Sequence, residues 1–341
     1  MVASDTGSEM EGERMIEAGP TIGAIRDAAD RLMGHAVRTP LLRHPAVDAR
    51  AGCAVYMKAE NLQRTGSFKF RGAFNAISRL DPSQARQGIY ACSSGNHAQG
   101  VAAAAALFGY SATIVMPEDA PRVKKERTRS LGATIVEYDR YRQDRDEVLA
   151  AEAAGRAVVH PYDDMDVVSG QGTVGLEAAD DCDRLDVTPV ALLCCAGGGG
   201  LAAGCFTALR DRFPRLRLHT CEPKDYDDQA RSIEAGHRVF VRPDQPTICD
   251  AIATPTPGRI AFACYGAVAS TGLVVTDEEA VEAVAFAYHH LRLVLEPGGA
   301  VALAAALRGG VASADEAILI TLSGGNLDRA VLDMALDRHP R

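Results

Sequence analysis

The chain has 341 residues, enough for one large or two medium-sized domains with hydrophobic cores. Apolar residues make up 47% and charged residues 24%, the composition of a soluble globular protein. The net charge of −9 argues against the basic surface that non-specific binding to nucleic acid requires. The nine cysteines, an odd number, form no CxxC pair and no zinc-type spacing with histidine. We therefore expect buried thiols in a reducing cytoplasm and no disulfide framework.

Two stretches bear on targeting and membrane insertion. Residues 1–19 are predicted to form a flexible tail, and the first 18 are acidic without the apolar core of a signal peptide. Residues 187–209 carry no charge but contain five glycines and one proline. A membrane-spanning helix tolerates these residues poorly, whereas a buried strand, a glycine turn and a helix fit them. The sequence thus predicts a cytoplasmic protein without a membrane segment.

Strand-like and helix-like segments alternate along most of the chain. Residues 53–60 are predicted to form a strand, and residues 67–80 a helix with Ser67 as its N-cap. Further strands are expected at 88–94, 111–117, 133–138, 190–196, 216–223 and 317–323. Helices are expected at 95–109, 121–132, 144–155, 167–182 and 201–213. Repeated βα units of this length predict an α/β protein with mostly parallel sheets flanked by helices.

The succession of these units predicts two domains. The strands in "SATIVMP" and "ATIVEY" belong to two successive βα units, which indicate a small domain at residues 87–160. The flanking segments, 20–86 and 161–341, should together form a larger domain.

Three polar turns follow predicted strands. "AGGGGL" (196–201) lies between a buried strand and a helix, where backbone N–H groups converge on an anion. It lacks both Gly-Lys-Ser/Thr and GxGxxG, so a small phosphate monoester fits better than a nucleoside triphosphate or a dinucleotide. "SSGNHAQG" (93–100) offers donors for a carboxylate or a ring oxygen, although a helix cap would also explain it. "SGGN" (323–326) is the third turn, and ligands of α/β proteins bind at such strand ends.

Six stretches, taken in order, resemble the tryptophan-synthase-like (fold type II) pyridoxal-phosphate enzymes, and within them the serine/threonine dehydratase and serine racemase group. They are "TGSFKFRGA" (65–73), "SSGNHAQGVA" (93–102), "PYDDMDVVSGQGTVGLE" (161–177), "AGGGGLAAG" (196–204), "EPGGAVALAA" (296–305) and "LSGGN" (322–326). The resemblance covers almost everything from residue 20 to residue 330. It implies the two-domain fold type II architecture and suggests a homodimer.

The resemblance also implies roles in holding the cofactor. Lys69 should form the Schiff base with pyridoxal 5'-phosphate, and Phe68 should pack beside the ring. Asn96 should bind the ring hydroxyl, and Ser323 should face the pyridine nitrogen. A hydroxyl at that position need not keep the nitrogen protonated, which favours prompt loss of a β-hydroxyl. The phosphate is expected on the backbone of Gly197, Gly198, Gly199 and Gly200.

The implied reaction is dehydration of a β-hydroxy amino acid such as L-threonine or L-serine to a 2-oxo acid and ammonia. Lys69 would remove the α-proton. Arg71 in the same motif is interpreted as a helix residue without a catalytic role. The substrate carboxylate is expected on donors of the second motif, Ser93, Ser94, Asn96 and His97.

Several alternatives stay open. The resembling racemases use a serine at the position of Ser94 as a second acid/base, so racemisation is possible, whereas the aromatic Tyr162 favours dehydration. Arg145 matches an arginine near the substrate of racemases, although its place on a surface helix is the favoured interpretation. 3-Hydroxyaspartate would need a further cation, and Arg140, Arg142 and Arg145 are candidates. A β-replacement enzyme like the cysteine synthases, or a non-catalytic pyridoxal-phosphate-binding protein, would be the rival interpretations.

A cation site is implied by "CEPKDYDDQA" (221–230). Family members that bind a divalent cation supply a glutamate, a backbone carbonyl and an aspartate at the spacing of Glu222, Tyr226 and Asp228. Oxygen ligands of this kind suit Mg²⁺, Mn²⁺ or Ca²⁺. A solvated acidic loop is the alternative interpretation.

Overall fold

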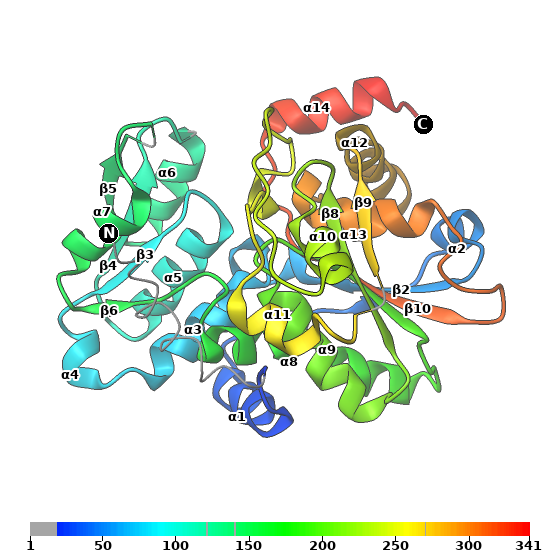
Figure 1. Ribbon diagram of the computed structural model, residues 1–341, viewed down its shortest axis with the longest axis horizontal. Coiled ribbons are helices and arrows are strands. Elements are labelled where there is room, and N and C mark those ends of the chain that lie inside the picture. The colour runs from blue at the N-terminus through cyan, green and yellow to red at the C-terminus, as the bar shows by residue number, and fades with distance from the viewer. Residues whose placement is uncertain (1–18, 121, 140, 270) are drawn as a thin grey trace, which may run out of the picture.

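The protein is described by a computed structural model that covers residues 19–120, 122–139, 141–269 and 271–341. Helices and strands alternate along it and build two sheets, each flanked by helices, in two lobes (Figure 1). The predicted α/β class with mostly parallel sheets is confirmed. Apart from its last residue, Gly19, the predicted N-terminal tail lies outside the described residues.

The larger sheet has six strands in the order β1-β2-β10-β7-β8-β9. β1 runs antiparallel to β2, and the other neighbours are parallel. Strands from the two ends of the chain therefore pair directly, as β2 does with β10. The strands are β1 (Leu41–Leu42), β2 (Ala54–Ala59), β7 (Ala191–Cys195), β8 (Arg217–Pro223), β9 (Thr271–Val275) and β10 (Ala317–Leu322).

The smaller sheet has four parallel strands in the order β5-β4-β3-β6. All four come from one continuous part of the chain, and the connections that enter and leave it contain the predicted domain boundaries at residues 86 and 160. The strands are β3 (Ile89–Cys92), β4 (Ala112–Pro117), β5 (Thr134–Tyr138) and β6 (Ala157–Val158).

Helices cover both faces of the larger sheet because its strands are apolar on both sides. Leu193 of β7 packs in one core cluster with α12 and α13, whereas its neighbour Leu192 packs in another with α8, α9 and α11. The helices are α1 (Ile22–Leu32), α2 (Pro45–Ala51), α3 (Lys69–Arg79), α4 (Pro82–Ala85), α5 (Asn96–Leu107), α6 (Arg122–Ser130), α7 (Arg145–Ala153), α8 (Met165–Arg184), α9 (Gly200–Arg212), α10 (Asp228–Ala235), α11 (Arg259–Tyr265), α12 (Asp277–Phe286), α13 (Pro297–Leu307) and α14 (Arg329–Arg338). Shorter turns are η1 (Glu60–Leu62), η2 (Arg64–Gly66), η3 (Asp250–Ile252) and the π-helical η4 (Ala287–Leu291).

The prediction that Ser67 caps α3 is wrong. The residue before the helix is Phe68, and no side chain caps the helix start. Ser67 is extended and forms a β-bridge with Gly324, in the turn that follows β10. Pairing with a distant segment therefore replaces the local cap and ties the start of α3 to the end of β10.

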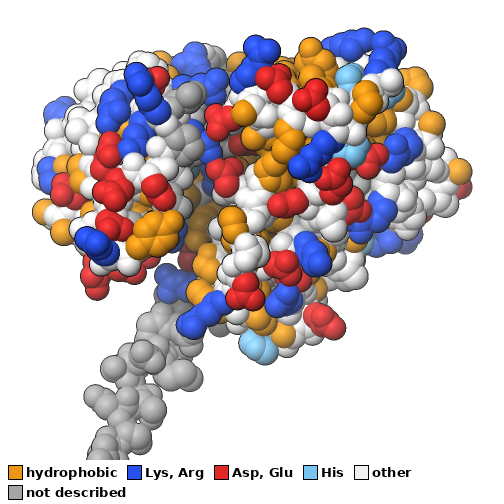
Figure 2. Space-filling view, turned by 90° about the horizontal axis from the view of Figure 1, so that it is seen from above, with side chains coloured by type: hydrophobic (Ala, Val, Ile, Leu, Met, Phe, Trp, Pro, Cys, Tyr) orange, Lys and Arg blue, Asp and Glu red, His pale blue; other side chains and the backbone are white. Residues whose placement is uncertain are grey.

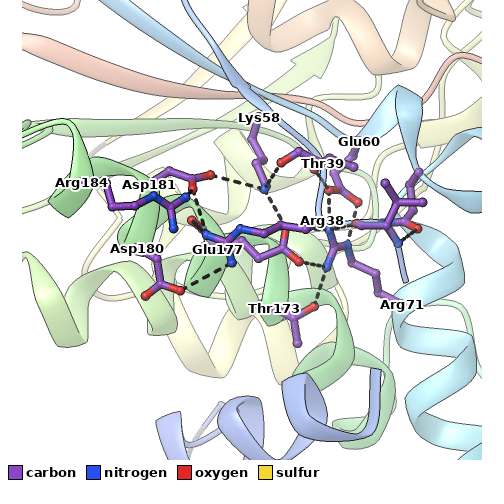
Figure 3. Close-up of polar contacts among 12 residues, drawn as sticks. Arg38, Thr39, Lys58, Glu60, Arg71, Thr173, Glu177, Asp180, Asp181 and Arg184 are labelled. Atoms are coloured by element: carbon purple, nitrogen blue, oxygen red, sulfur yellow. Dashed lines mark hydrogen bonds and ion pairs between the residues drawn. The ribbon is translucent and has the colours of Figure 1, made fainter. Parts of the chain in front are cut away.

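A buried cluster of paired charges holds α3 against β2, η1 and α8 (Figure 3). Arg71 is 1% exposed and donates to both carboxylate oxygens of Glu60 and of Glu177 at 2.8–2.9 Å. Lys58 donates to Glu177 at 2.6 Å and to the Thr39 carbonyl at 2.7 Å. This paired-charge cluster (Lys58, Glu60, Arg71 and Glu177) fixes the helix that carries Lys69, in agreement with the interpretation of Arg71 as a non-catalytic residue.

The distribution of surface charge and the state of the cysteines agree with what the composition led us to expect. Lys and Arg side chains are interspersed with Asp and Glu on the face shown in Figure 2, without a broad basic patch among its described residues. All nine cysteines are free, and seven of them are buried. No helix in the described part of the chain is long and apolar enough to cross a membrane.

Candidate active site

A cavity of about 140 Å³ lies where the carboxyl ends of β3, β7 and β10 meet. The three polar turns of the sequence line it, together with the start of α3 from the first motif. The predicted site residues that line it are Phe68, Lys69, Ser93, Ser94, Asn96, His97, Gly197, Gly198, Gly199, Gly200 and Ser323. Segments far apart in the sequence thus build one site.

Lys69 differs from three of the other four lysines. The sequence has five, at positions 58, 69, 124, 125 and 224. Lys58, Lys124 and Lys125 each form an ion pair with a carboxylate. The Lys69 ammonium instead donates to the uncharged Pro161 carbonyl at 2.7 Å, and desolvation lowers the pKa of Lys69 to about 8. An amine that is readily neutral inside a cavity is suited to act as a nucleophile and a base.

The glycine turn leaves the start of α9 open. Gly199 precedes the helix with a φ of 85°, a conformation that favours glycine, and no side chain caps the helix. The first-turn N–H groups have no acceptor within the helix, so they are available to an anion. A Cβ on Gly198 would lie 2.2 Å from the Tyr162 ring, so the backbone packs directly on that side chain. A phosphate group fits this set of donors.

Asn96 is held by two residues from distant motifs. Its Nδ2 donates to Glu296 Oε1 at 2.6 Å, and its Oδ1 accepts from Asn326 Nδ2 at 2.7 Å. Burial raises the pKa of Glu296 to about 7. Glu296 and Asn326 line the cavity but were not predicted as site residues. They stand at the ends of two of the recognised motifs, and their contact with Asn96 is a long-range property that the motifs do not show.

Ser323 is placed beside Lys69 by backbone pairing. The Ser323 carbonyl accepts from the Phe68 N–H at 3.2 Å, next to the Ser67–Gly324 bridge. The Lys69 amine lies 5.1 Å from the centre of the Phe68 ring. The geometry therefore brings Phe68, Lys69 and Ser323 together at one wall of the cavity.

His97 has a fixed ring. Its Nε2 lies 2.9 Å from the Val159 carbonyl, which only accepts, so Nε2 carries the hydrogen. Burial lowers the pKa of His97 to about 3, and the neutral ring leaves Nδ1 as an acceptor without a partner in the described part of the chain. An acceptor is unsuited to a carboxylate. Ser93 differs, because its Oγ accepts from the Gly95 N–H at 3.1 Å and keeps its own hydrogen to donate.

Arg145 does not line the cavity. It borders a neighbouring hollow with Ser93 and Ser94, its side chain is 49% exposed, and it pairs with Asp146 at 3.2 Å. The Arg142 side chain is 86% exposed and lies 3.4 Å from Asp139. Arg140 lies outside the described residues.

Glu222 and Asp228 are fully buried at the end of β8 and the start of α10. Glu222 accepts from the Gln229 and Ala230 N–H groups at 2.7 and 2.8 Å. Asp228 accepts from the Thr254 hydroxyl at 3.4 Å, and its Oδ2 has no partner among the described residues. Burial raises the pKa of both carboxyls, that of Asp228 to about 8, and the charge of Asp228 raises that of Glu222 further.

The described residues contain no group of three His, Cys, Asp or Glu side chains arranged to bind a metal. The predicted site has two side-chain ligands, Glu222 and Asp228, and a backbone carbonyl of Tyr226.

Comparison with known proteins identifies the family. The model for "Pyridoxal-phosphate dependent enzyme" matches residues 32–324. The chain belongs to the pyridoxal-phosphate-dependent enzymes. It is 42% identical over 304 residues to an L-threo-3-hydroxyaspartate ammonia-lyase of Pseudomonas sp, covering 88% of this chain and 93% of that protein. It is 36% identical over 312 residues to a serine racemase of Schizosaccharomyces pombe, covering 91% and 95% of the two chains.

Solved structures show the same fold. A threonine deaminase from T.th. superposes with a TM-score of 0.85 at 38% identity, covering 91% of this chain and 99% of that one. The predicted fold type II pyridoxal-phosphate architecture is confirmed. The predicted lyase class agrees with the ammonia-lyases among these relatives.

The cavity fits pyridoxal phosphate as the cofactor. The uncapped start of α9 suits the phosphate, Lys69 is the cavity lysine without a carboxylate partner among the described residues, and Asn96 offers a polar group for the ring hydroxyl. The Glu296 carboxylate holds the Asn96 amide, so the orientation of Asn96 is set by the protein before the cofactor binds.

Proposed function

We propose that the protein is an ammonia-lyase that converts a β-hydroxy amino acid to a 2-oxo acid and ammonia. The observation that carries the proposal is Lys69, whose amine has a lowered pKa. This amine faces a cavity that is also lined by the glycine turn (residues 197–200) and by a serine-rich turn (residues 93–96). These are the groups needed to anchor the cofactor, move the α-proton and bind the substrate carboxylate.

Bound pyridoxal phosphate supplies the electron sink that makes loss of the α-proton and the β-hydroxyl feasible. Lys69 Nζ would hold the cofactor covalently, and the same nitrogen, when free, would take the α-proton of the substrate. The N–H groups at Gly197–Gly200 would hold the phosphate, Asn96 the ring hydroxyl and Ser323 the ring nitrogen. In net terms the α-proton and the β-hydroxyl leave as water, and a second water molecule then converts the remaining imine to the 2-oxo acid and ammonia.

The turn at residues 93–96 would bind the substrate carboxylate. Ser93 and Ser94 both line the cavity, and the Ser93 hydroxyl retains a hydrogen to donate. Since the ring of His97 offers an acceptor, we leave it out of the carboxylate site. Ser94 would supply the second proton-transfer group of a racemase, so some racemisation should accompany dehydration.

The substrates we propose are L-threo-3-hydroxyaspartate, L-threonine and L-serine. The relatives named above are an L-threo-3-hydroxyaspartate ammonia-lyase and a serine racemase, and the related structure is a threonine deaminase. Arg145, at the neighbouring hollow, would contribute to the field that attracts an anionic substrate.

We further propose that Glu222, the carbonyl of Tyr226 and Asp228 bind a divalent cation, Mg²⁺, Mn²⁺ or Ca²⁺. Two buried carboxyls without a cationic partner among the described residues, one of them with an oxygen that has no partner there, support the proposal. A bound cation would also influence the position of the glycine turn through Gln229. The Gln229 N–H donates to Glu222, and the Gln229 side chain donates to the Gly197 carbonyl at 2.5 Å.

The homodimer and the cytoplasmic location stay predictions. Sedimentation analysis would test the homodimer.

The test is an assay of the purified holoenzyme with L-serine, L-threonine and the 3-hydroxyaspartate isomers, each with Mg²⁺ or EDTA. Release of 2-oxo acid and ammonia in equal amounts is expected, with lower rates in EDTA and no turnover by Lys69→Ala. O-acetylserine with sulfide tests the β-replacement alternative, which faster thiol-amino-acid formation than ammonia release would support. Bound cofactor without ammonia from any hydroxyamino acid would overturn the proposal.

A further inference from the structure

An ion pair crosses the cavity between the two parts of the molecule. Lys124, on α6 beside the small sheet, contacts Asp250, on η3 beside the large one, with Nζ 2.5 Å from Oδ2. Both residues line the cavity, together with Lys69 and the turn at residues 93–96. The charges of Asp250 and Lys124 act on the pKa of Glu296 in opposite directions, so the pair lies close to the Asn96–Glu296 contact.

The charges of the cavity leave Lys124 as the cation available to a substrate. Among the described residues that line it, Lys69 and Lys124 are the cationic side chains, and Lys69 is needed for the cofactor. The acidic residues are Asp250 and Glu296, and Glu296 accepts from Asn96. A substrate with one carboxylate can use the serine-rich turn alone, whereas a second carboxylate has to meet a cation.

Exposure makes the Lys124–Asp250 pair suited to exchange. The Lys124 side chain is 16% exposed, whereas that of Asp250 is 60% exposed. If a carboxylate of the substrate replaces that of Asp250, the mostly buried ammonium keeps a charged partner and Asp250 becomes hydrated at low cost. No new charge has to be buried without a partner. Arg142 and Arg145, two of the three candidates from sequence, lie outside this cavity, and the third, Arg140, lies outside the described residues.

We propose that Lys124 determines specificity for a β-hydroxy amino acid with a second carboxylate, by exchanging its ion pair with Asp250 for one with that carboxylate. The inference rests on the proposed function and names the subsite that would distinguish a dicarboxylic substrate from L-serine. Asp250 is then an internal competitor, which occupies Lys124 when the substrate carries one carboxylate.

The exchange predicts effects of opposite sign for the two partners. Loss of the Lys124 charge removes the subsite, whereas loss of the Asp250 charge frees Lys124 for the substrate. If the Lys124–Asp250 pair only holds the two lobes together, a different result is expected. Either substitution then breaks the same contact and changes kcat/KM for both substrates by the same factor.

The test compares kcat/KM for L-threo-3-hydroxyaspartate with kcat/KM for L-serine in four holoenzyme variants. Lys124→Gln should lower the ratio about tenfold or more, the effect of one charged hydrogen bond. Asp250→Asn should raise the ratio, and Lys124→Arg should keep it well above that of Lys124→Gln. The matched control is Lys125→Gln, because the neighbouring Lys125 pairs with Glu137 away from the cavity, and it should leave the ratio unchanged.

Inhibition gives a second readout that requires no turnover of the ligand. L-aspartate and L-alanine lack the β-hydroxyl and differ by the second carboxylate, so the preference for L-aspartate as an inhibitor of L-serine turnover should weaken with Lys124→Gln. If Lys124→Gln and Asp250→Asn change both substrates by equal factors, the specificity role is wrong and the pair is a structural contact. If the wild-type enzyme releases ammonia from no hydroxyamino acid, L-threonine included, the proposed function itself fails, which is a different result.

Discussion

Two buried groups of charges in this molecule have opposite construction. In the paired-charge cluster, the cations of Lys58 and Arg71 face the carboxylates of Glu60 and Glu177, and each carboxylate meets a cation (Figure 3). At the end of β8, Glu222 and Asp228 are also fully buried, but they raise each other's energy when ionised, and Asp228 Oδ2 has no partner among the described residues.

This difference distinguishes buried charges that stabilise the fold from buried charges that are suited to bind a ligand. Removing charges from water is tolerated when the partners within the fold neutralise them, as around Arg71. Buried carboxyls without such partners keep raised pKa values and are suited to bind something that supplies the missing charge. The nearby Arg231 does not supply it, because it pairs with Asp227 at 2.9 Å and is half-exposed.

The largest expected effect is on the paired-charge cluster. Arg71→Met leaves Glu60 and Glu177 buried with fewer cations, so the free energy of unfolding should fall by about 3–5 kcal/mol. Urea-induced unfolding followed by circular dichroism measures it. A loss below about 1 kcal/mol would mean that the cluster is not a main support of α3.

The next effect is on the acidic pair. A divalent cation at 100 times its dissociation constant should raise the free energy of unfolding by about 2.7 kcal/mol, because it binds the folded state. Thermal unfolding in Mg²⁺ and in EDTA measures the gain. Asp228→Asn should abolish the gain, and Asp225→Asn, an exposed acidic neighbour in the same loop, should preserve it. Equal gains in both variants would place the cation elsewhere.

The pH dependence of stability in the cation-free protein should distinguish the acidic pair, Glu222 and Asp228, from the paired-charge cluster. Asp228 has a raised pKa in the folded state, so between about pH 4 and pH 8 the folded protein holds a proton that the unfolded chain releases. Stability should therefore fall as pH rises through this window, by up to about 1.4 kcal/mol per pH unit for one group. Glu177 acts in the opposite sense, because its pKa is lowered in the folded state. Its contribution to stability is therefore lost only when the pH falls below the ordinary pKa of a glutamate.

Urea titrations in EDTA at several pH values measure this slope. Saturating Mg²⁺ should flatten it, because the cation keeps both carboxyls ionised in the folded state. A slope that Mg²⁺ leaves unchanged would argue against cation binding by this pair.

The smallest expected effect is on an exposed pair from the same helix as Arg71. Arg79 lies 2.7 Å from Asp166, with side chains 48% and 41% exposed. Arg79→Met should change the free energy of unfolding by less than about 1 kcal/mol, since water screens the pair. The same urea experiment measures it, and a loss as large as that of Arg71→Met would show that burial is not what distinguishes the two.

Local sequence patterns predicted much of the fold. The βα alternation and the all-apolar β7 indicated the sheets, and the glycine turn indicated a phosphate site. The cofactor and the role of Lys69 were implied by the resemblance to the fold type II enzymes. No elements were predicted between residues 224 and 316, where α10 to α13 and β9 lie. α13 is apolar on all sides because it is buried on all sides, so it shows no amphipathic period.

What could not be predicted depends on contacts between distant segments. The Ser67–Gly324 bridge overrode a plausible local cap, and the ring of His97 is oriented by a carbonyl 62 residues away. The hydrogen bond from Asn96 to Glu296 joins residues 200 positions apart, and the Lys124–Asp250 pair joins residues 126 positions apart. Spacing along the chain carries no signal for pairs of this kind.

The assignment of Lys69 as the cofactor lysine can be tested by borohydride reduction of the holoenzyme followed by peptide mass spectrometry. Of the five lysines in the sequence, we expect a phosphopyridoxyl group on the peptide that contains Lys69 and on no other. A label on Lys124, the second lysine of the cavity, or no covalent label in a protein that retains the cofactor, would contradict it.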